Sequence, residues 1–388
     1  MEDQPKDFVQ HILNQQATPN HYLQTKINLL MHMLKSESIK LSEVRQLTFS
    51  GLPDECNGLR SLIWRLILHY LPDDYHKWEQ FLVEKIEDYE HFKVHFVYEN
   101  LNKIQGELDE ENINNYFREL DPIWFQIYKD VIRTRRELNF FSFIRVPQWR
   151  VDIEKRLVAD YNNPELTKYV DNITHNDLMI HILYVFAKLN PGIGYIQGMN
   201  ELLAPIYYTF ATDNNPVFKE SMEADTFYCL TKLIAETKDN FVRQLDSSPI
   251  GLKQMMQQLN DLLRIVDNRV WKHLEKNEVN PQFYSIRWCL LLLTQEFELP
   301  EILQIWDLFL ADENRFEYFY YFCVNMVVTH RDLILKGDFN DNIKLLQKMP
   351  SVPVRQLLIS TQELYDKYSR KKRVAKLQLT RSASFQVQ

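Results

Sequence analysis

Apolar residues recur along most of this chain at the three- and four-residue spacing of an amphipathic helix. The clearest run consists of Leu59, Leu62, Ile63, Leu66 and Ile67. A second run, between Leu252 and Val266, keeps the same spacing over about four helical turns. Strict alternation of apolar and polar residues, which is typical of a half-buried strand, is hard to find. The pattern therefore predicts an all-α fold with no significant sheet.

Capping residues and prolines indicate where several helices begin. Asp121 followed by Pro122 is typical of a helix start, and we expect that helix to carry both Asp130 and Arg133 on one face. Asn176 is expected to cap a further helix that ends before the Asn-Pro-Gly sequence at 190–192. The apolar stretch that follows, from Leu202 to Phe210, predicts a deeply buried helix.

The chain divides into four parts by composition. Residues 1–44 predict a helical lead-in, and residues 45–335 a large helical domain. Within that domain, residues 142–175 are interrupted by prolines and an Asn-Asn pair, so we expect an irregular surface excursion there. Residues 336–366 predict C-terminal helices, and the basic, polar tail 367–388 is expected to be disordered.

Composition excludes several classes of protein. The 388 residues are 45% hydrophobic, which supplies a sizeable core, and the net charge of -8 gives no bias toward nucleic acid. Only eight glycines are present, fewer than phosphate-binding sheet folds usually need. The four cysteines form no C-x-x-C pair, which favours buried thiols in a reducing compartment over disulfides or zinc. Neither a signal peptide nor a transmembrane segment is expected. We expect a cytoplasmic protein, with peripheral recruitment to endomembranes left open.

Two short segments carry the candidate chemistry. Asp130 and Arg133 lie three residues apart, a spacing that alone is most often a surface ion pair. Gln197 lies in a loop where three of the eight glycines gather, which indicates positive φ angles or close approach of another chain. No phosphate-binding G-x-x-x-x-G-K-[ST] loop, metal cluster or nucleophile–base pair accompanies them. An arginine and a glutamine presented in this way suit the completion of another protein's active site, as in GTP hydrolysis by a small GTPase.

The two segments together resemble the paired signatures of the TBC domain, a family of Rab GTPase activators. The signatures read Ile127-x-x-Asp130-x-x-Arg133-Thr134 and Tyr195-x-Gln197-Gly198-Met-Asn200. Supporting matches extend the resemblance over residues 45–335, and the amino-acid sequence around the second signature is similar to that of one branch of the family.

The resemblance implies a two-lobed, all-α TBC domain whose catalytic residues act on a GTP-bound Rab-family GTPase. Arg133 would neutralise charge on the transferred phosphoryl group, and Gln197 would orient the attacking water. The chain would need no cofactor of its own, because GTP and Mg²⁺ are carried by the partner. The two side chains are expected to meet at a concave surface between or beside the lobes.

The resemblance also implies supporting roles for other residues of the signatures and of the wider match. Support of the two fingers or contact with the GTPase is expected of Asp130, Tyr195, Gly198 and Asn200. In particular, Asp130 is expected to orient Arg133. Structural support is expected of Arg60, Arg287 and Asp307, and Arg60 and Asp307 are expected to be buried partners in ion pairs.

One departure from the family pattern and two rival functions stay open at this stage. Arg136 stands where the family commonly has proline, which puts the loop geometry after Arg133 in doubt. A catalytically silent adaptor of the same fold is the first rival, and the presence of both finger residues argues against it. A self-contained hydrolase is the second, and it lacks a supporting motif.

Overall fold

The computed structural model describes residues 21–34, 36, 38–49, 51–52, 57–141, 144–242 and 251–384. Within these residues the chain is helical, and extended pairing is limited to one isolated bridge between Arg145 and Thr174. The prediction of an all-α fold is confirmed. The described residues belong to two compact units: the first reaches to Gln244 and includes Phe297–Ala311, and the second combines Leu245–Glu296 with the chain from Asp312 onward.

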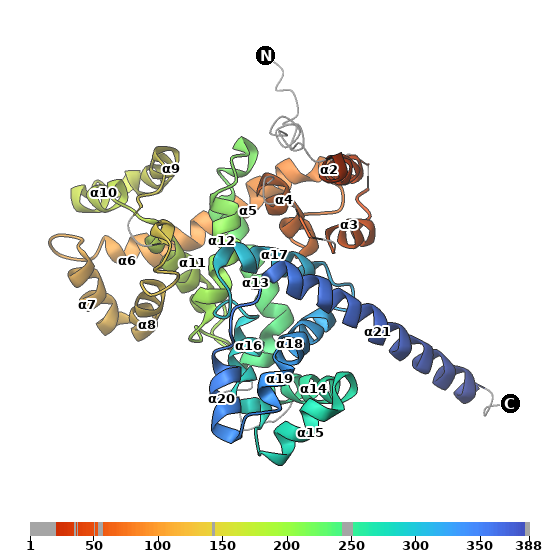
Figure 1. The fold of residues 1–388 in the computed structure, drawn as a ribbon. Coiled ribbons are helices and arrows are strands. Elements are labelled where there is room, and N and C mark those ends of the chain that lie inside the picture. The colour runs from red at the N-terminus through yellow and green to blue at the C-terminus, as the bar shows by residue number, and fades with distance from the viewer. Residues whose placement is uncertain are drawn as a thin grey trace. The chain divides into compact units, whose positions relative to one another are not determined.

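The first unit contains most of the helices (Figure 1). Its α-helices are α2 (His21–Leu34), α3 (Leu41–Thr48), α4 (Asn57–Ile67), α5 (Trp78–Lys93), α6 (Glu99–Leu101), α7 (Glu110–Leu120), α8 (Pro122–Val131), α9 (Gln148–Val158), α10 (Pro164–Asp171), α11 (His175–Leu189), α12 (Met199–Ala211), α13 (Met222–Val242) and α17 (Leu299–Ala311). A π-helical turn, Val94–Tyr98, joins α5 to α6. The short 3₁₀ turns are Tyr75–Lys77, Asn139–Phe141, Ala159–Tyr161 and Pro216–Phe218.

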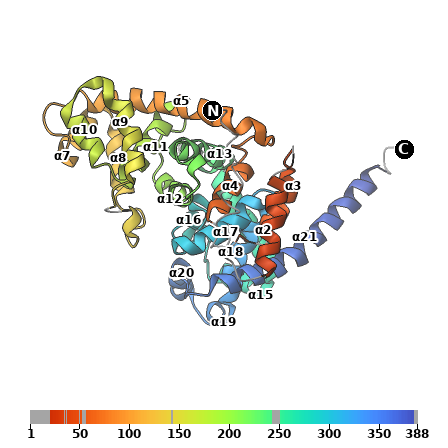
Figure 2. The same ribbon diagram turned by 90° about the horizontal axis from the view of Figure 1, so that it is seen from above.

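The core of this unit lies around α11 and α12. Helix α12 packs against α11, α13, α4 and α17, and nearly all of its side chains are buried. The predicted apolar face of α4 is buried as well, because Leu59, Leu62 and Ile63 have no exposed surface. In two views at right angles, α7, α8, α9 and α10 lie together beside α11 (Figures 1 and 2).

Residues 142–175 correct one prediction, because most of them form helices α9 and α10. The prolines begin these helices: Pro147 directly precedes α9, and Pro164 is the first residue of α10, after an Asn163 side chain that accepts from the amides of Glu165 and Leu166. The following helix, α11, is capped by Thr174 in a capping box with Asp177, and the predicted cap Asn176 lies inside it.

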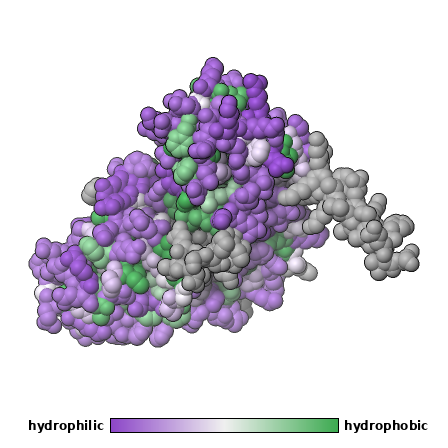
Figure 3. All heavy atoms as spheres, turned by 90° about the horizontal axis from the view of Figure 1, so that it is seen from below, coloured by the Kyte–Doolittle hydropathy of each residue, from purple (hydrophilic) through white to green (hydrophobic). Residues whose placement is uncertain are grey.

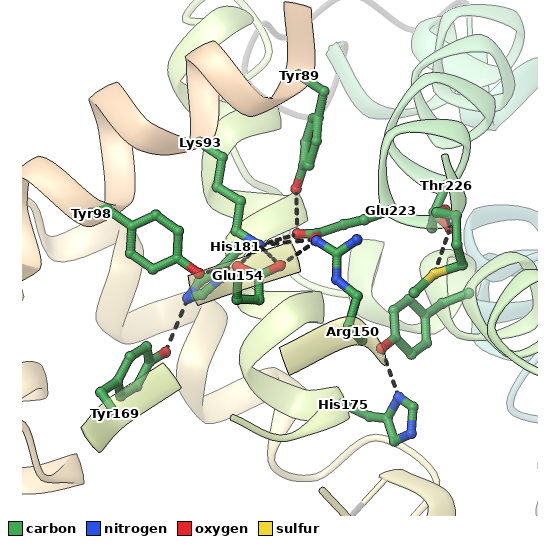
Figure 4. Close-up of polar contacts among 12 residues, drawn as sticks. Tyr89, Lys93, Tyr98, Arg150, Glu154, Tyr169, His175, His181, Glu223 and Thr226 are labelled. Carbon is green, nitrogen blue, oxygen red and sulfur yellow. Dashed lines mark hydrogen bonds and ion pairs between the residues drawn. The ribbon is translucent and has the colours of Figure 1, made fainter. Parts of the chain in front are cut away.

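One face of helix α9 is also buried, where the sequence predicted a surface. Four charged side chains from α5, α9 and α13 meet in the interior and are at most 3% exposed (Figure 4). They are Lys93, Arg150, Glu154 and Glu223. The Lys93 ammonium lies 2.8 Å from a carboxylate oxygen of each glutamate, and Arg150 donates to both glutamates. The cluster holds two cations and two anions, so its charges balance without solvent.

The second unit is a smaller helical bundle. It contains α14 (Gly251–Val266), α15 (Asn268–Lys276), α16 (Ser285–Leu291), α18 (Glu317–Thr329), α19 (Arg331–Ile334), α20 (Phe339–Gln347) and α21 (Val354–Ser384), with a 3₁₀ turn at Pro281–Phe283. Helix α14 buries Leu259 and Leu263 and packs against α15, α16 and α18, as its periodicity predicted. Helix α21 packs against α18 and extends beyond it (Figure 1).

The units divide the chain differently from the predicted parts. Helices α2 and α3 of the predicted lead-in pack within the first unit, where α3 contacts α4 and α17. Residues 336–366 belong to the second unit together with α14–α16. Helix α21 continues to Ser384, so most of the tail 367–388 is helical where disorder was expected. The first 20 residues, Pro53 and Cys56 lie outside the described residues.

Three further observations concern the cysteines, the length of the apolar helices and the polarity of the molecular surface among the described residues. Cys229, Cys289 and Cys323 are free and buried, as expected. Among the described residues, no helix combines the length and apolar character that crossing a bilayer requires. The face of the molecule in Figure 3 is mostly hydrophilic, with its apolar side chains in small groups.

Candidate functional site

Helix α8 positions the first candidate segment. The Asp121 side chain accepts a hydrogen bond of 3.0 Å from the amide of Ile123, and Pro122 occupies the first turn, so the predicted start of this helix is confirmed. The helix ends at Val131, earlier than predicted. Asp130 lies in its last turn and Arg133 in the turn that follows, so the two do not share a helical face.

The turn after α8 presents Arg133 outward. Backbone φ is +47° at Arg135, whose buried guanidinium donates to the carbonyl of Phe297 at 2.8 Å. The Arg136 Nε atom donates back to the carbonyl of Ile132 at 2.9 Å. The turn is therefore tied at two points, while the Arg133 side chain between them is exposed. Within the described part of the chain, the Arg133 guanidinium makes no hydrogen bond or ion pair.

The loop between α11 and α12 presents Gln197. Gly194 and Gly198 adopt φ angles of +65° and +102°, which favour glycine, so the positive φ predicted for this glycine cluster is confirmed at these two positions. Gly198 directly precedes the first residue of α12. Gln197 is exposed, whereas Tyr195 and Asn200 on either side of it are 8% and 5% exposed.

Hydrogen bonds between Tyr195, Asn200, Asp130 and Thr134 join the two segments. The Tyr195 hydroxyl lies 2.8 Å from Asp130 Oδ2 and 3.2 Å from Asn200 Oδ1. Asn200 Nδ2 donates to Thr134 Oγ1 at 2.8 Å. Burial and, next, the Asp130 carboxylate raise the pKa of Tyr195, so its hydroxyl keeps its proton and donates it.

This network brings together segments that lie more than 60 residues apart in sequence. It holds the turn with Arg133 against the loop with Gln197 and leaves both side chains exposed. The Asp130 carboxylate binds Tyr195, and no ion pair between Asp130 and Arg133 is present among the described residues. The expectation that Asp130 orients Arg133 directly is therefore corrected: Asp130 fixes the second segment against the first.

The remaining predicted residues form separate ion pairs. Arg60 and Asp307 form the expected buried ion pair, with Nη2 and Oδ2 3.0 Å apart, and Trp64 Nε1 donates to the same carboxylate at 2.8 Å. Burial raises the pKa of Asp307, and the Arg60 charge opposes that rise. Arg287 belongs to the second unit and forms a partly exposed ion pair with Glu296 at 2.6 Å.

The buried charge cluster of Figure 4 was missed by the sequence reasoning. Its one sequence signal is the four-residue spacing of Arg150 and Glu154, which is the same spacing as a common surface pair on a helix. Among the described residues, no group of three or more His, Cys, Asp and Glu side chains is arranged to hold a metal ion.

Comparisons with known proteins give consistent matches. The family model of the Rab-GTPase-TBC domain matches residues 146–335, a range that includes the Gln197 loop and begins after Arg133. Human TBC1 domain family member 13 is 34% identical over 386 residues, covering 86% of this chain and 96% of that protein. The GTPase-activating protein gyp1 of Schizosaccharomyces pombe is 25% identical, over 89% of this chain and 61% of that protein.

Solved structures resemble the fold. The crystal structure of the Ypt/Rab-GAP domain of Gyp1p superposes with a TM-score of 0.67 at 23% identity, covering 89% of this chain and 99% of that one. The Chlamydomonas flagellar RabGAP TBC domain gives a TM-score of 0.53 at 13% identity, covering 93% of this chain and 95% of that one.

Proposed function

Because this chain belongs to the Rab-GTPase-TBC domain family, we propose that it accelerates GTP hydrolysis by a Rab-family GTPase in its GTP-bound state. The observation that carries the proposal is the hydrogen-bond network of Tyr195, Asn200, Asp130 and Thr134. It holds two exposed side chains, an arginine and a glutamine, on neighbouring turns of one unit. We propose that these two groups enter one nucleotide site together.

Arg133 is proposed to stabilise the negative charge that develops on the transferred phosphoryl group. Its planar guanidinium carries a permanent charge, and an arginine supplied in trans is worth about 10³ to 10⁵ in rate for such reactions. The turn on either side of it is tied by Arg135 and Arg136. This anchoring reduces the conformational entropy that docking costs, so more of the interaction with the phosphates is available for catalysis.

Gln197 is proposed to orient the attacking water, with its carboxamide accepting from and donating to that water. Tyr195 and Asn200 act as positioning residues, because each bonds to the segment that carries Arg133. Gly198 provides the left-handed backbone that turns the loop into α12. The chain itself would supply no cofactor, since GTP and Mg²⁺ arrive with the GTPase. The consequence for the cell would be the termination of a trafficking signal on an endomembrane.

Single-turnover GTP hydrolysis tests this proposal across a panel of purified, GTP-loaded Rab proteins. For a responsive Rab, we expect Arg133→Ala to lower the stimulated rate by about 10³-fold or more and Gln197→Ala to abolish the stimulation as well. Arg269→Ala and Gln257→Ala, which change exposed residues of the second unit, are the matched controls and should keep the parental rate. Both finger variants should melt within about 2 °C of the parent, since surface substitutions usually change stability little.

The same assay separates the adaptor alternative. A silent adaptor would bind a GTP-loaded Rab without raising its hydrolysis rate, and neither finger variant would alter that rate. Full stimulation by both finger variants would refute the assignment of Arg133 and Gln197.

A further inference from the structure

A cavity of about 780 Å³ opens beside the turn that carries Arg133. Its walls come from the start of α7, from α8 and the turn after it, from α10, and from the first turns of α11, all within the first unit. Ile132 and Arg136, which lie on either side of Arg133 in the chain, are part of its lining. The volume is in the range of protein ligand sites, about 300–1,000 Å³.

The charged residues in the lining of this cavity are predominantly acidic. Its carboxylates are Glu107, Asp109, Glu110, Glu165 and Asp177. They exceed the two cations of the lining, Arg136 and Lys168. Lys168 Nζ lies 3.2 Å from Glu107 and 3.6 Å from Glu165, so one ammonium is shared between two carboxylates. A concave surface with excess charge of one sign focuses its field and attracts the opposite charge.

Three polar atoms in the walls have no hydrogen-bond partner in the described part of the chain. Asn114 and Trp124 both line the cavity and are only 7% and 3% exposed. Among the described residues, neither Asn114 Oδ1 nor Trp124 Nε1 has a hydrogen-bond partner, and the same holds for Oδ1 of Asn176. Buried polar atoms are nearly always satisfied, so these atoms are candidates for a partner from outside the chain, water included. Two of these three atoms are acceptors, which suits a donor-rich group.

We propose that this cavity receives a basic side chain, lysine or arginine, from the GTPase that docks on Arg133. The inference rests on the proposed function, because it places the GTPase over this turn. A protein whose nucleotide site admits Arg133 lies close to Ile132 and Arg136, which line the cavity. The carboxylates supply the charge complementarity, and the half-buried ring of Tyr128 in the lining is a further contact for a cation. Such a contact would select among GTPases by their surface charge.

Kinetics with a responsive GTPase test the cavity separately from the finger. The double variant Glu107→Gln/Glu110→Gln removes two exposed carboxylates of the lining and keeps their shape. We expect it to raise KM for the GTP-loaded GTPase by roughly three- to tenfold, as for two partly screened charge contacts, with kcat preserved. It should also flatten the dependence of kcat/KM on salt concentration.

The matched control is Glu84→Gln/Glu87→Gln, which removes two exposed carboxylates with the same spacing from α5 and should keep the parental KM. The cavity proposal would be overturned if Glu107→Gln/Glu110→Gln kept the parental KM and salt dependence while Arg133→Ala stayed inactive. That result would leave the proposed function standing. Failure of the parent to stimulate any GTPase would instead refute the function. Spermidine added to the GTPase-free protein tests whether the cavity binds a small cation instead. If spermidine raised the melting temperature of the parent but not of Glu107→Gln/Glu110→Gln, and that variant kept the parental KM for the GTPase, the proposal would also be overturned.

Discussion

The substitution Glu154→Gln tests whether the buried charge cluster holds α9 in the first unit. Both Glu154 carboxylate oxygens lie 2.8 Å from Lys93 Nζ, and Tyr98 and Arg150 also donate to this carboxylate. Burial alone would raise the pKa of Glu154, but the charges of Lys93 and Arg150 outweigh it and hold the pKa below its usual range. Glutamine keeps the shape of the side chain and removes one negative charge. The cluster then has two cations against the single carboxylate of Glu223.

The cost follows from leaving a charge uncompensated in the interior. Removal of one partner from a buried ion pair typically costs about 3–5 kcal/mol. Such a loss is a large part of an ordinary domain's free energy of unfolding, about 5–15 kcal/mol. For a unit of this size, it corresponds to a fall in melting temperature of roughly 6–20 °C.

Thermal and urea unfolding, followed by circular dichroism, measure this loss. Glu87→Gln removes an exposed carboxylate from α5 and is the matched control, expected within about 0.5 kcal/mol of the parent. Adding Lys93→Met to Glu154→Gln leaves Arg150 and Glu223 as a balanced pair. The double variant should therefore be more stable than the sum of the two single losses predicts. A Glu154→Gln protein within about 1 kcal/mol of the parent would refute the reasoning that the cluster depends on charge balance.

Two further predictions concern the segment network and pH. Tyr195→Phe removes the hydroxyl that lies 2.8 Å from Asp130, and we expect single-turnover stimulation to fall about tenfold, as for a lost bond to a charged group. Asp130→Asn removes the charge at the other end of the same bond, so the two substitutions should not lower the rate additively. Strictly additive losses in the Tyr195→Phe/Asp130→Asn double variant would contradict this shared bond. Burial lowers the pKa of His175 to about 4 from 6.5, so the unfolded chain binds a proton that the folded chain does not. The contribution of neutral His175 to the free energy of unfolding is therefore fully present above pH 6.5. It is lost as the pH falls toward 4, by up to about 1.4 kcal/mol per pH unit. Urea unfolding at several pH values gives the free energy of unfolding as a function of pH. Between about pH 4 and 6.5 this free energy should change less with pH in His175→Gln than in the parent, and an unchanged pH dependence would count against the prediction.

The sequence by itself determined the helices with regular periodicity and the family. The apolar spacing of α4 and α14 needs only residues within a few turns, so it could be interpreted without coordinates. The cap at Asp121 is equally local, because its side chain reaches an amide two residues away. The two signature segments also sufficed to indicate the TBC family, which the comparisons confirm.

Tertiary structure alone decided which charges are buried and where the candidate side chains point. Arg150 and Glu154 have the spacing of a surface pair, and only packing against Lys93 and Glu223 takes them out of water. Arg133 lies beyond its helix in a turn that Arg135 ties to Phe297, 162 residues along the chain. The physical reason is common to these cases. Periodicity and capping depend on neighbours within a few residues, whereas the partner of a charge depends on which distant segments the packed core brings beside it.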